Sequence, residues 1–367
     1  MFLGLSEPDA LERVAVAEIQ GLGVTHYPGT ALPDADMSIF LRWTLRRESI
    51  PPALKDPRNW PAPMREEWGD DQGAKAAALH RERLVQAFRR VREALDAFQP
   101  DFVVIWGDDQ YENFREDIVP PFCVFILDEV ASTPLALQGD RGPLANIWGE
   151  PADKVFTHSG HPAGARHLAR RLIEEGFDIP YAYTVRDPRG LAHAFVNTLL
   201  FLDCDRRGFP YPVVPFHVNC YGSSVIRSRG GAAAPGQEQG EPDPPGPTAR
   251  RCFEVGAATA RILRASPWRV SLIGSSSWSH AFLTAKNWWL YPDIEADRRL
   301  LEQLRSGRYP EWRNLTAAEI ETAGQHELLN WLCLAGAMAE LGRSVEIVDY
   351  VQSWVFNSNK CFAVFPA

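Results

Sequence analysis

Apolar runs that stop abruptly at polar residues recur along the chain and predict the strands of a buried sheet. The clearest runs from Phe102 to Trp106, where five apolar residues in a row, three of them β-branched, are typical of a strand covered on both faces. Further strands are predicted within the runs 14–24, 123–127, 211–219 and 268–273. The tail of the chain also ends in an apolar, strand-like run.

A different pattern, with apolar residues three and four apart, predicts helices between these strands. It is clearest over Gln72 to Phe98, which ends before Pro100. Another helix is expected over about 162–175, with Gly176 as its C-cap. The remaining helices are expected near 249–266, 293–306 and 316–341. This alternation indicates an α/β fold, with a single domain over 1–367 and a central mixed sheet flanked by helices.

Three segments lack such patterns. Residues 31–70 carry many Pro and Trp and predict an irregular region with short helices, and residues 132–154 predict a turn-rich connection. Residues 228–248 are rich in Gly, Pro and small or polar residues. They predict a flexible surface insert within the domain.

Composition argues against several classes of protein. The net charge of −9, without a long Lys/Arg cluster, argues against a nucleic-acid-binding surface. No apolar run reaches the length of about 18 residues that a membrane span needs. The N-terminus lacks the features of a signal peptide, and the six scattered cysteines fit neither a disulfide framework nor a zinc ribbon. A cytoplasmic protein is therefore expected.

The chain is rich in aromatic residues, with twelve Trp, nineteen Phe and nine Tyr. Such side chains suit a hydrophobic core, and equally a pocket for a flat aromatic ligand.

Polar loops follow three of the predicted strands. They carry His26, the sequence Asp108-Asp109-Gln110, and His280. Since ligands bind at the carboxyl ends of the strands in open α/β sheets, we expect these loops to gather at one edge of the sheet and to form the site there. Imidazole, carboxylate and amide groups together suit a hard divalent metal with open positions, or acid–base work on a polar ligand.

The sequence motifs of nucleophilic hydrolysis and of phosphate binding are absent. The chain has no GxSxG nucleophile elbow and no GxxxxGK[ST] phosphate loop. His158 and His161 lie three residues apart before a predicted helix and could share a metal, but a polar, structural role is the simpler expectation.

Several short motifs, taken in order along the chain, support a site with metal or acid–base chemistry. They are THYP at 25–28, DDQ at 108–110 with Phe114 behind it, IVP at 118–120, GHP at 160–162, His193, VVPFHVN at 213–219, SSWSH at 276–280 and HELLNWL at 326–332. In this order and spacing, from about residue 20 to 365, they resemble the class III extradiol ring-cleavage dioxygenases. That family is typified by the catalytic β-subunit of protocatechuate 4,5-dioxygenase.

The resemblance implies a non-haem Fe(II)-dependent dioxygenase that opens a catechol-like or aminophenol-like aromatic ring with O₂. His26 and Glu327 match two of the family's iron ligands. His280 matches its acid–base histidine, which would take a phenol proton and later return one. His193 matches a histidine that hydrogen-bonds substrate or bound oxygen.

The chain departs from the family at the metal, because Gln110 stands where the second ligand histidine is expected. A Gln amide oxygen is a harder and weaker ligand than imidazole, so iron affinity is expected to fall. Gln110 could still ligate, or Asp109 or Asp108 could reach the metal and give one histidine and two carboxylates. The alternative is a family member without dioxygenase activity that binds a small aromatic ligand or a protein partner.

The resemblance also bears on assembly. The family's catalytic subunit often works with a small partner subunit that closes the pocket. The extra length near 30–70 and 228–248 could close the pocket from within this chain, so we expect a homo-oligomer, most simply a dimer.

Overall fold

The computed structural model describes residues 17–136, 138–139, 142–221, 223, 225–230 and 241–367. Two parts of the sequence predictions lie outside these described residues. They are the start of the first predicted strand, 14–16, and the central part of the Gly/Pro-rich insert, 231–240.

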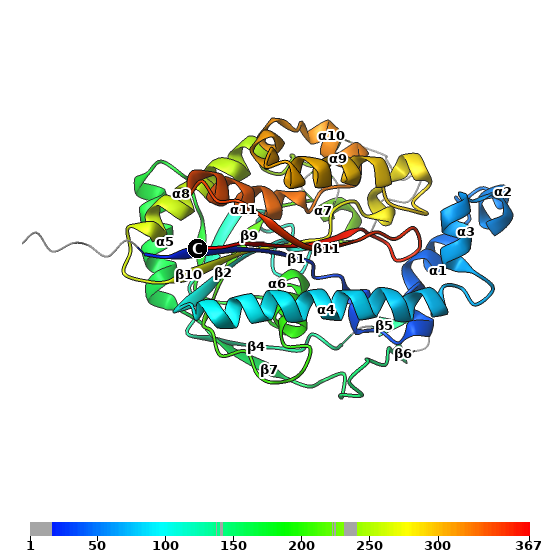
Figure 1. Cartoon of the computed structure of the whole chain (residues 1–367), viewed down its shortest axis with the longest axis horizontal. Helices are drawn as coiled ribbons and strands as arrows, with labels where there is room; N and C mark the ends of the chain where they lie inside the picture. The colour runs from blue at the N-terminus through cyan, green and yellow to red at the C-terminus, as the bar shows by residue number, and fades with distance from the viewer. Residues whose placement is uncertain (1–16, 137, 140–141, 222, 224, 231–240) are drawn as a thin grey trace, which may run out of the picture.

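An eight-stranded sheet runs through the molecule, in the order β11-β12-β1-β10-β2-β9-β3-β8 (Figure 1). Its strands are β1 (Ile19–Val24), β2 (Phe102–Gly107), β3 (Phe122–Phe125), β8 (Tyr181–Ala182), β9 (Val213–Val218), β10 (Val270–Ser275), β11 (Glu346–Val351) and β12 (Lys360–Phe365). The four central strands β1, β10, β2 and β9 are parallel, whereas β12 and β3 pair antiparallel with their neighbours β1 and β9. The mixed sheet is thus confirmed. Two small ribbons, β4 (Glu129–Ser132) with β7 (Phe156–Ser159) and β5 (Gln138–Gly139) with β6 (Gly142–Pro143), lie outside it.

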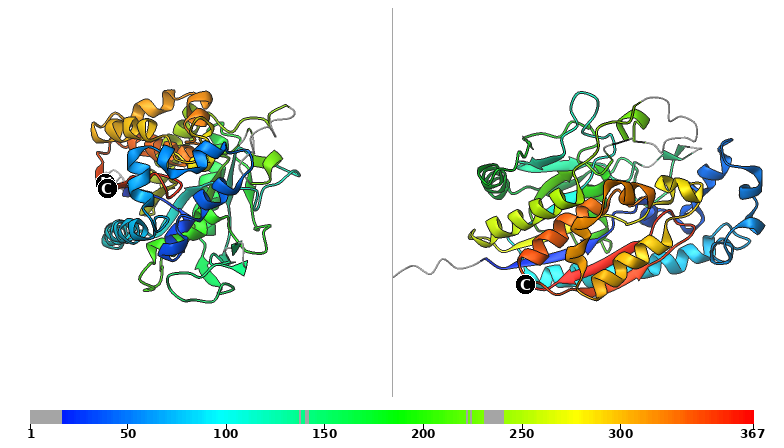
Figure 2. Two further views of the ribbon diagram at one scale, coloured as in Figure 1. Left: turned by 90° about the vertical axis from the view of Figure 1, so that its right-hand side faces the viewer. Right: turned by 90° about the horizontal axis from the view of Figure 1, so that it is seen from above.

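Helices cover both faces of the sheet, as Figures 1 and 2 show. They are α1 (Ile39–Arg46), α2 (Pro52–Lys55), α3 (Ala62–Trp68), α4 (Ala74–Phe98), α5 (Pro162–Glu174), α6 (His193–Leu202), α7 (Val225–Ser228), α8 (Ala249–Arg264), α9 (Ile294–Arg305), α10 (Ala317–Thr322) and α11 (Leu328–Glu340). Short 3₁₀ turns occupy Pro28–Ala31, Asp34–Asp36, Pro57–Asn59, Ala281–Leu283, Ala285–Asn287 and Tyr309–Asn314.

Strand β2 separates two hydrophobic cores. Phe102, Val104 and Trp106 point into the core formed with α5, α8 and α11. Val103 and Ile105 point into the other core, formed with α4 and α6. The alternation follows from the two-residue period of a strand, and both sets are fully buried. An unbroken apolar run was therefore the correct signal for a strand with both faces covered.

Two predictions near the C-terminus need correction. The helix predicted over 316–341 is broken, because α10 ends at Thr322 and α11 begins at Leu328. Gly324 has a positive φ of 64° in this gap, a backbone conformation that ends a helix. No strand was predicted between the helix near 316–341 and the apolar tail, so β11 was missed. That strand is only half-buried and carries Glu346 and Asp349, so it lacks the apolar run that marks the central strands.

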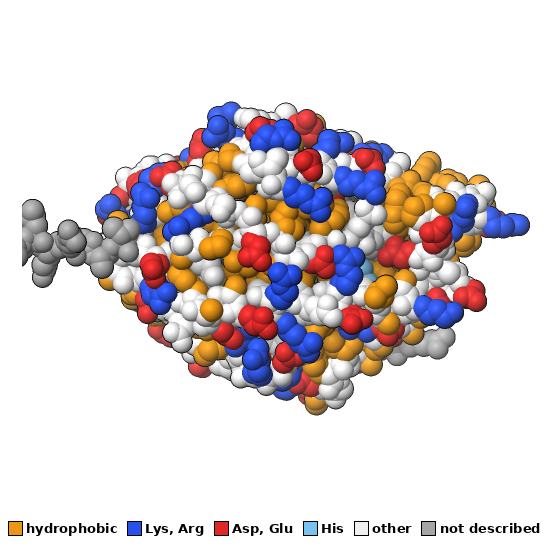
Figure 3. All heavy atoms as spheres, viewed as in Figure 1, with side chains coloured by type: hydrophobic (Ala, Val, Ile, Leu, Met, Phe, Trp, Pro, Cys, Tyr) orange, Lys and Arg blue, Asp and Glu red, His pale blue; other side chains and the backbone are white. Residues whose placement is uncertain are grey.

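Within the described residues, no helix is long and apolar enough to cross a membrane. On the face drawn in Figure 3, basic and acidic side chains are interspersed and neither sign forms a continuous patch.

Helices α8 and α11 pack closely together on one face of the sheet (Figure 2). A Cβ atom added to Gly256 would lie 1.8 Å from the carbonyl oxygen of Cys333, and one added to Gly336 would lie 2.0 Å from that of Phe253. Glycine at both positions therefore lets the two helix backbones touch. This contact fixes α11, whose N-terminus carries Glu327.

We expect Gly256→Ala to destabilise the protein. Helix propensity alone would make alanine the more stable residue by about 1 kcal/mol. The added methyl group meets backbone that cannot move aside cheaply, and such overpacking typically costs about 1–3 kcal/mol. A lower midpoint of denaturant unfolding would agree with this packing. A higher midpoint would mean that the helices separate at little cost.

Candidate active site and metal centre

The loops that follow β1, β10 and β2 meet at one edge of the sheet. These strands are neighbours and parallel, with Val24 opposite Ser275 and Gly274 opposite Trp106, so their carboxyl ends lie side by side. The loops bring His26, His280 and Asp108 to this edge. Glu327 joins them from the gap between α10 and α11, and His193 joins them from the first residue of α6.

Glu327 lies between two imidazoles. Its Oε2 atom is 3.2 Å from Nε2 of His26 and 3.3 Å from Nε2 of His280. Its Oε1 atom accepts a hydrogen bond from the hydroxyl of Tyr221. Burial alone would raise the pKa of Glu327, but the charges of His280 and His26 hold that pKa well below its usual value. Glu327 is thus a buried carboxylate that stays ionised.

A second buried carboxylate, Asp108, faces the same histidine. Its Oδ1 atom lies 3.8 Å from Nε2 of His26 and accepts a hydrogen bond of 2.8 Å from Nδ2 of Asn330. Burial, together with the nearby charge of Glu327, raises the pKa of Asp108 to about 6. The protein therefore holds two carboxylates close together, and both are almost fully buried.

Hydrogen bonds fix which nitrogen of each imidazole faces these carboxylates. Nδ1 of His26 lies 3.1 Å from the hydroxyl of Ser275, and Nδ1 of His280 lies 2.9 Å from the carbonyl oxygen of Trp278. In both rings Nε2 is left to face Glu327. For His280, burial lowers the pKa, but the charge of Glu327 outweighs burial and raises it.

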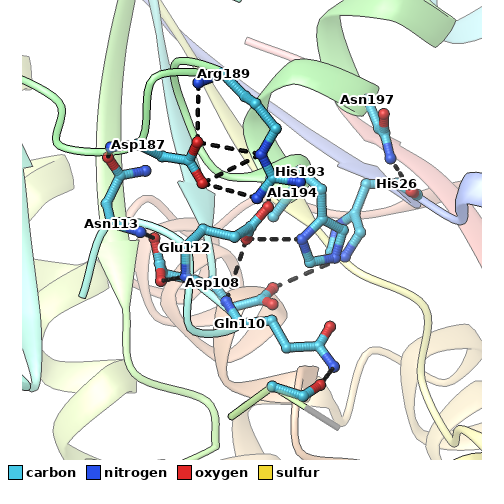
Figure 4. Close-up of polar contacts among 12 residues, drawn as sticks. His26, Asp108, Gln110, Glu112, Asn113, Asp187, Arg189, His193, Ala194 and Asn197 are labelled. Carbon is cyan, nitrogen blue, oxygen red and sulfur yellow. Dashed lines mark hydrogen bonds and ion pairs between the residues drawn. The ribbon is translucent and has the colours of Figure 1, made fainter. Parts of the chain in front are cut away.

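Glu112 clamps His193, a role that the sequence did not reveal. The carboxylate accepts hydrogen bonds of 2.9 Å from the backbone N–H of His193 and of 2.9 Å from its Nδ1 (Figure 4). Burial opposes a charge on His193, but the charge and hydrogen bond of Glu112 dominate and raise its pKa to about 10. The His193 ring meets the His26 ring edge-on at 5.1 Å. The only feature of the sequence that could have pointed to this role is the position of Glu112 in the polar loop after β2.

The segments that carry His280 and Glu327 are tied together by Asp297, in the first turn of α9. This buried carboxylate accepts hydrogen bonds from the backbone N–H of Ser279 (3.1 Å), Nε2 of Gln325 (2.6 Å) and Nδ2 of Asn359 (2.7 Å). One side chain thus holds a residue next to His280 and a residue close to Glu327 in fixed positions.

The residues at this edge fit a divalent metal ion. His26, Asp108 and His193 each offer a ligand atom, and these atoms lie within 4.8 Å of one another. Among the described residues, no group donates a hydrogen bond to Oδ2 of Asp108 or Oε2 of Glu327, although both atoms are buried. Buried polar atoms normally have partners, so two unpartnered carboxylate oxygens, one of them 3.2 Å from Nε2 of His26, are what a cation site would leave.

The structure places Gln110 and Asp109 differently from Asp108. The Nε2 atom of Gln110 donates a hydrogen bond to the carbonyl oxygen of Gly230, and its side chain is directed away from His26 in Figure 4. The carboxylate of Asp109 accepts hydrogen bonds from the backbone N–H groups of residues 112, 113 and 114, at 2.8, 2.8 and 3.3 Å. Asp109 therefore shapes its own loop. The carboxylate that faces His26 is Asp108, which the sequence had offered only as an alternative to Asp109.

A cavity of about 300 Å³ opens on this cluster. It is lined by His26, His193, His280 and Glu327, and by Gln110 at its wall. Phe40, Trp43, Thr44 and Arg47, from the irregular segment 31–70, line it as well. A second cavity of about 350 Å³ adjoins it, since both are lined by Pro28, Phe40, Gln110, His193 and Gly230. The pocket is therefore closed in part by the segment that the sequence left without regular structure.

The histidines near α5 lie elsewhere. Nδ1 of His161 accepts a hydrogen bond of 3.0 Å from the backbone N–H of Gly164, and its ring stacks on Phe102 at 4.3 Å. His161 thus caps α5 and packs on the sheet. Among the described residues, neither His158 nor His161 belongs to a group that could hold a metal.

Comparison with known proteins agrees with this geometry. Residues 244–363 match the family model for the catalytic LigB subunit of aromatic ring-opening dioxygenase. The chain is 26% identical over 319 residues to a 2,3-dihydroxyphenylpropionate/2,3-dihydroxicinnamic acid 1,2-dioxygenase of Paraburkholderia xenovorans (strain LB400), an alignment that covers 74% of this chain and 86% of the relative. It is 28% identical over 197 residues to a protein of the same description from Pseudomonas putida. That alignment covers 54% of this chain and 49% of the relative, so this chain spans about half the length of that protein.

Among solved structures, an uncharacterized protein of Escherichia coli K12 aligns with a TM-score of 0.46 at 14% identity, over 77% of this chain and 92% of that protein.

The family model spans His280 and Glu327, two of the residues that the structure brings together at the edge of the sheet. In residues 244–363 and in its relatives, the chain is therefore similar to the class III extradiol ring-cleavage dioxygenases, the family that its motifs resemble.

Proposed function

We propose that this protein is a non-haem Fe(II)-dependent dioxygenase that opens a catechol-like or aminophenol-like ring with O₂. One observation carries the proposal. The buried carboxylates of Asp108 and Glu327 both face Nε2 of His26, and one oxygen of each, Oδ2 of Asp108 and Oε2 of Glu327, has no hydrogen-bond partner among the described residues. The names of the related proteins, which are ring-cleaving dioxygenases, support the same reaction class.

His26, Asp108 and Glu327 would hold the metal; His193, whose ligand atom lies within 4.8 Å of those of His26 and Asp108, is assigned to the substrate because Glu112 holds its ring. When bound, Fe(II) would acidify the hydroxyl groups of the diol and provide the place where diol and O₂ meet. Gln110 can add its amide oxygen only by turning that group toward the cluster, because its Nε2 atom is held by the carbonyl of Gly230. The ligand set is then one imidazole and two carboxylates, which favours a harder cation than two imidazoles would.

The cavity residues supply the remaining functions. Nε2 of His280 faces the cavity while Nδ1 is held by the carbonyl of Trp278, so His280 can take the proton of a substrate hydroxyl and later return it. His193, held by Glu112, directs its free ring nitrogen at the same space and can donate a hydrogen bond to a substrate oxygen. Phe40, Trp43 and Phe282 give the cavity aromatic walls that suit a flat ring.

The second candidate is a relative without dioxygenase activity that binds an aromatic ligand, and Gln110 in place of a family ligand histidine favours it. Anaerobic titration with Fe(II), followed by oxygen uptake with catechols, gallates and aminophenols, separates the two. Stoichiometric iron, substrate-dependent uptake and a yellow ring-opened product support the dioxygenase. Absence of both iron binding and uptake supports the second candidate.

We expect Asp108→Asn to lower iron affinity about 100-fold or more, because even residues that only orient metal ligands typically contribute about 10–100-fold. The neighbouring Asp109→Asn is the matched control. It makes the same chemical change in a side chain that bonds its own loop, so it should lower thermal stability more than iron affinity. Anaerobic calorimetry with Fe(II) measures both variants. If Asp109→Asn lowered iron affinity more than Asp108→Asn does, Asp109 would be the ligand.

We expect His280→Gln to lower kcat by about 10²–10⁴-fold, the usual contribution of a general acid–base group. Iron content should stay near that of the wild type, since Nε2 of His280 is directed at Glu327 and is not needed to hold the metal. His167→Gln, on α5 and outside this cavity, serves as the control. Equal losses in both variants, or loss of iron in His280→Gln alone, would contradict the assigned role.

We expect the protein to form a homodimer in solution. Segment 31–70 contributes a wall of the cavity, so a separate small subunit is not needed to cover it. Light scattering on the purified chain gives the mass directly. A monomer at micromolar concentration would end this expectation without affecting the proposed chemistry.

A further inference from the structure

Tyr221 lies just beyond the carboxyl end of β9, the strand that pairs with β2 in the sheet. Its side chain is buried, and its hydroxyl donates a hydrogen bond to Oε1 of Glu327. Its ring stacks on that of His326, with the ring centroids 6.0 Å apart and an angle of 22° between the planes. Its backbone N–H donates to Oδ1 of Asn219 at 3.3 Å. The protein itself therefore holds this hydroxyl against Glu327.

The hydrogen bond determines which oxygen of Glu327 stays free. An ionised carboxylate only accepts hydrogen bonds, so the Tyr221 hydroxyl is the donor and Oε1 is the acceptor. The other oxygen, Oε2, has no hydrogen-bond partner among the described residues and lies 3.2 Å from Nε2 of His26. A lysine or arginine at this position would also orient the carboxylate, but its charge would repel a cation. A neutral hydroxyl orients the carboxylate and leaves its charge in place.

Asp108 is arranged in the same way by Asn330, one turn along α11 from Glu327. Nδ2 of Asn330 donates hydrogen bonds to Oδ1 of Asp108 at 2.8 Å and to the carbonyl oxygen of Ser275 at 3.0 Å. The oxygen of the Asn330 amide accepts from the thiol of Cys220 at 3.6 Å, which fixes the orientation of the amide. In the part of the chain that the structure describes, each of these two buried carboxylates thus has one oxygen held by a neutral donor and one without such a donor.

We propose that Tyr221 is a positioning residue for the metal: by holding Oε1, it makes Glu327 offer only Oε2 to the cation. This inference rests on the proposed function, in which His26, Asp108 and Glu327 hold a metal ion. Residues that orient metal ligands typically contribute about 10–100-fold to affinity. Ca(II) readily takes both oxygens of one carboxylate, so restriction to one oxygen disfavours Ca(II) relative to Fe(II). Tyr221 should therefore affect the choice of metal as well as the affinity.

The first test is anaerobic calorimetry of Fe(II) binding to the full chain. We expect Tyr221→Phe to lower the affinity about 10–100-fold, because the ring remains and only the hydrogen bond is lost. Tyr309→Phe is the matched control. It removes another buried hydroxyl, which donates to the carbonyl of Arg343 at 2.6 Å, beyond the opposite end of α11 from Glu327. The control should leave iron affinity unchanged. Wild-type affinity in Tyr221→Phe, or equal losses in both variants, would overturn the inference.

The second test measures Ca(II) binding in the same proteins and needs no turnover. We expect the ratio of Fe(II) affinity to Ca(II) affinity to fall by about 10-fold in Tyr221→Phe, because the freed Oε1 becomes available to Ca(II). A hydroxyl that only supports the fold would weaken the binding of both ions equally. An unchanged ratio would therefore overturn the inference.

Oxygen uptake with catechol separates this inference from the proposed reaction. If Tyr221→Phe changes affinity and ratio as expected but the iron-loaded wild type consumes no oxygen, only the proposed reaction fails. If the wild type consumes oxygen and Tyr221→Phe binds both metals as the wild type does, only the inference fails. A wild type that binds no Fe(II) would overturn both.

Discussion

The structure depends on how it compensates negative charge that is buried at the edge of the sheet. Asp108 and Glu327 lie in the interior, where an ionised carboxylate without partners costs several kcal/mol. Glu327 is approached by Nε2 of both His26 and His280, and Asp108 by that of His26 and by Asn330. The compensation is incomplete, since one oxygen of each carboxylate has no hydrogen-bond partner among the described residues. A divalent cation would complete it.

The sheet makes this concentration of charge possible. Parallel pairing of β1, β10 and β2 forces three loops to the same edge, and the break between α10 and α11 inserts Glu327 among them. Close packing of α11 on α8 and the hydrogen bonds of Asp297 hold that insertion in place. The favourable energy of two hydrophobic cores thus supports a site whose own charges oppose folding.

Much of this arrangement could be predicted from the sequence, because it follows from simple patterns. Apolar runs identified the central strands, and the polar residues behind them identified the loops that meet. The distinction between Asp108 and Asp109 could not be predicted. Adjacent residues in a loop point in different directions, and which of them is bound by backbone N–H groups depends on the folded turn. Glu112 and Tyr221 were missed for the same reason, since their partners appear only in three dimensions.

In the proposed site, Gln110 in place of a ligand histidine would change the net charge at the metal as well as its ligands. Two imidazoles and one carboxylate leave a divalent cation with a net positive charge that attracts a negatively charged diolate. One imidazole and two carboxylates cancel that charge. Attraction for an anionic ligand must then come from elsewhere in the pocket. His193, with a pKa of about 10, supplies positive charge close to the cluster. Arg47 supplies it in the cavity wall. With the proposed ligand set of His26, Asp108 and Glu327, these cations would replace the positive charge that the second carboxylate cancels at the metal.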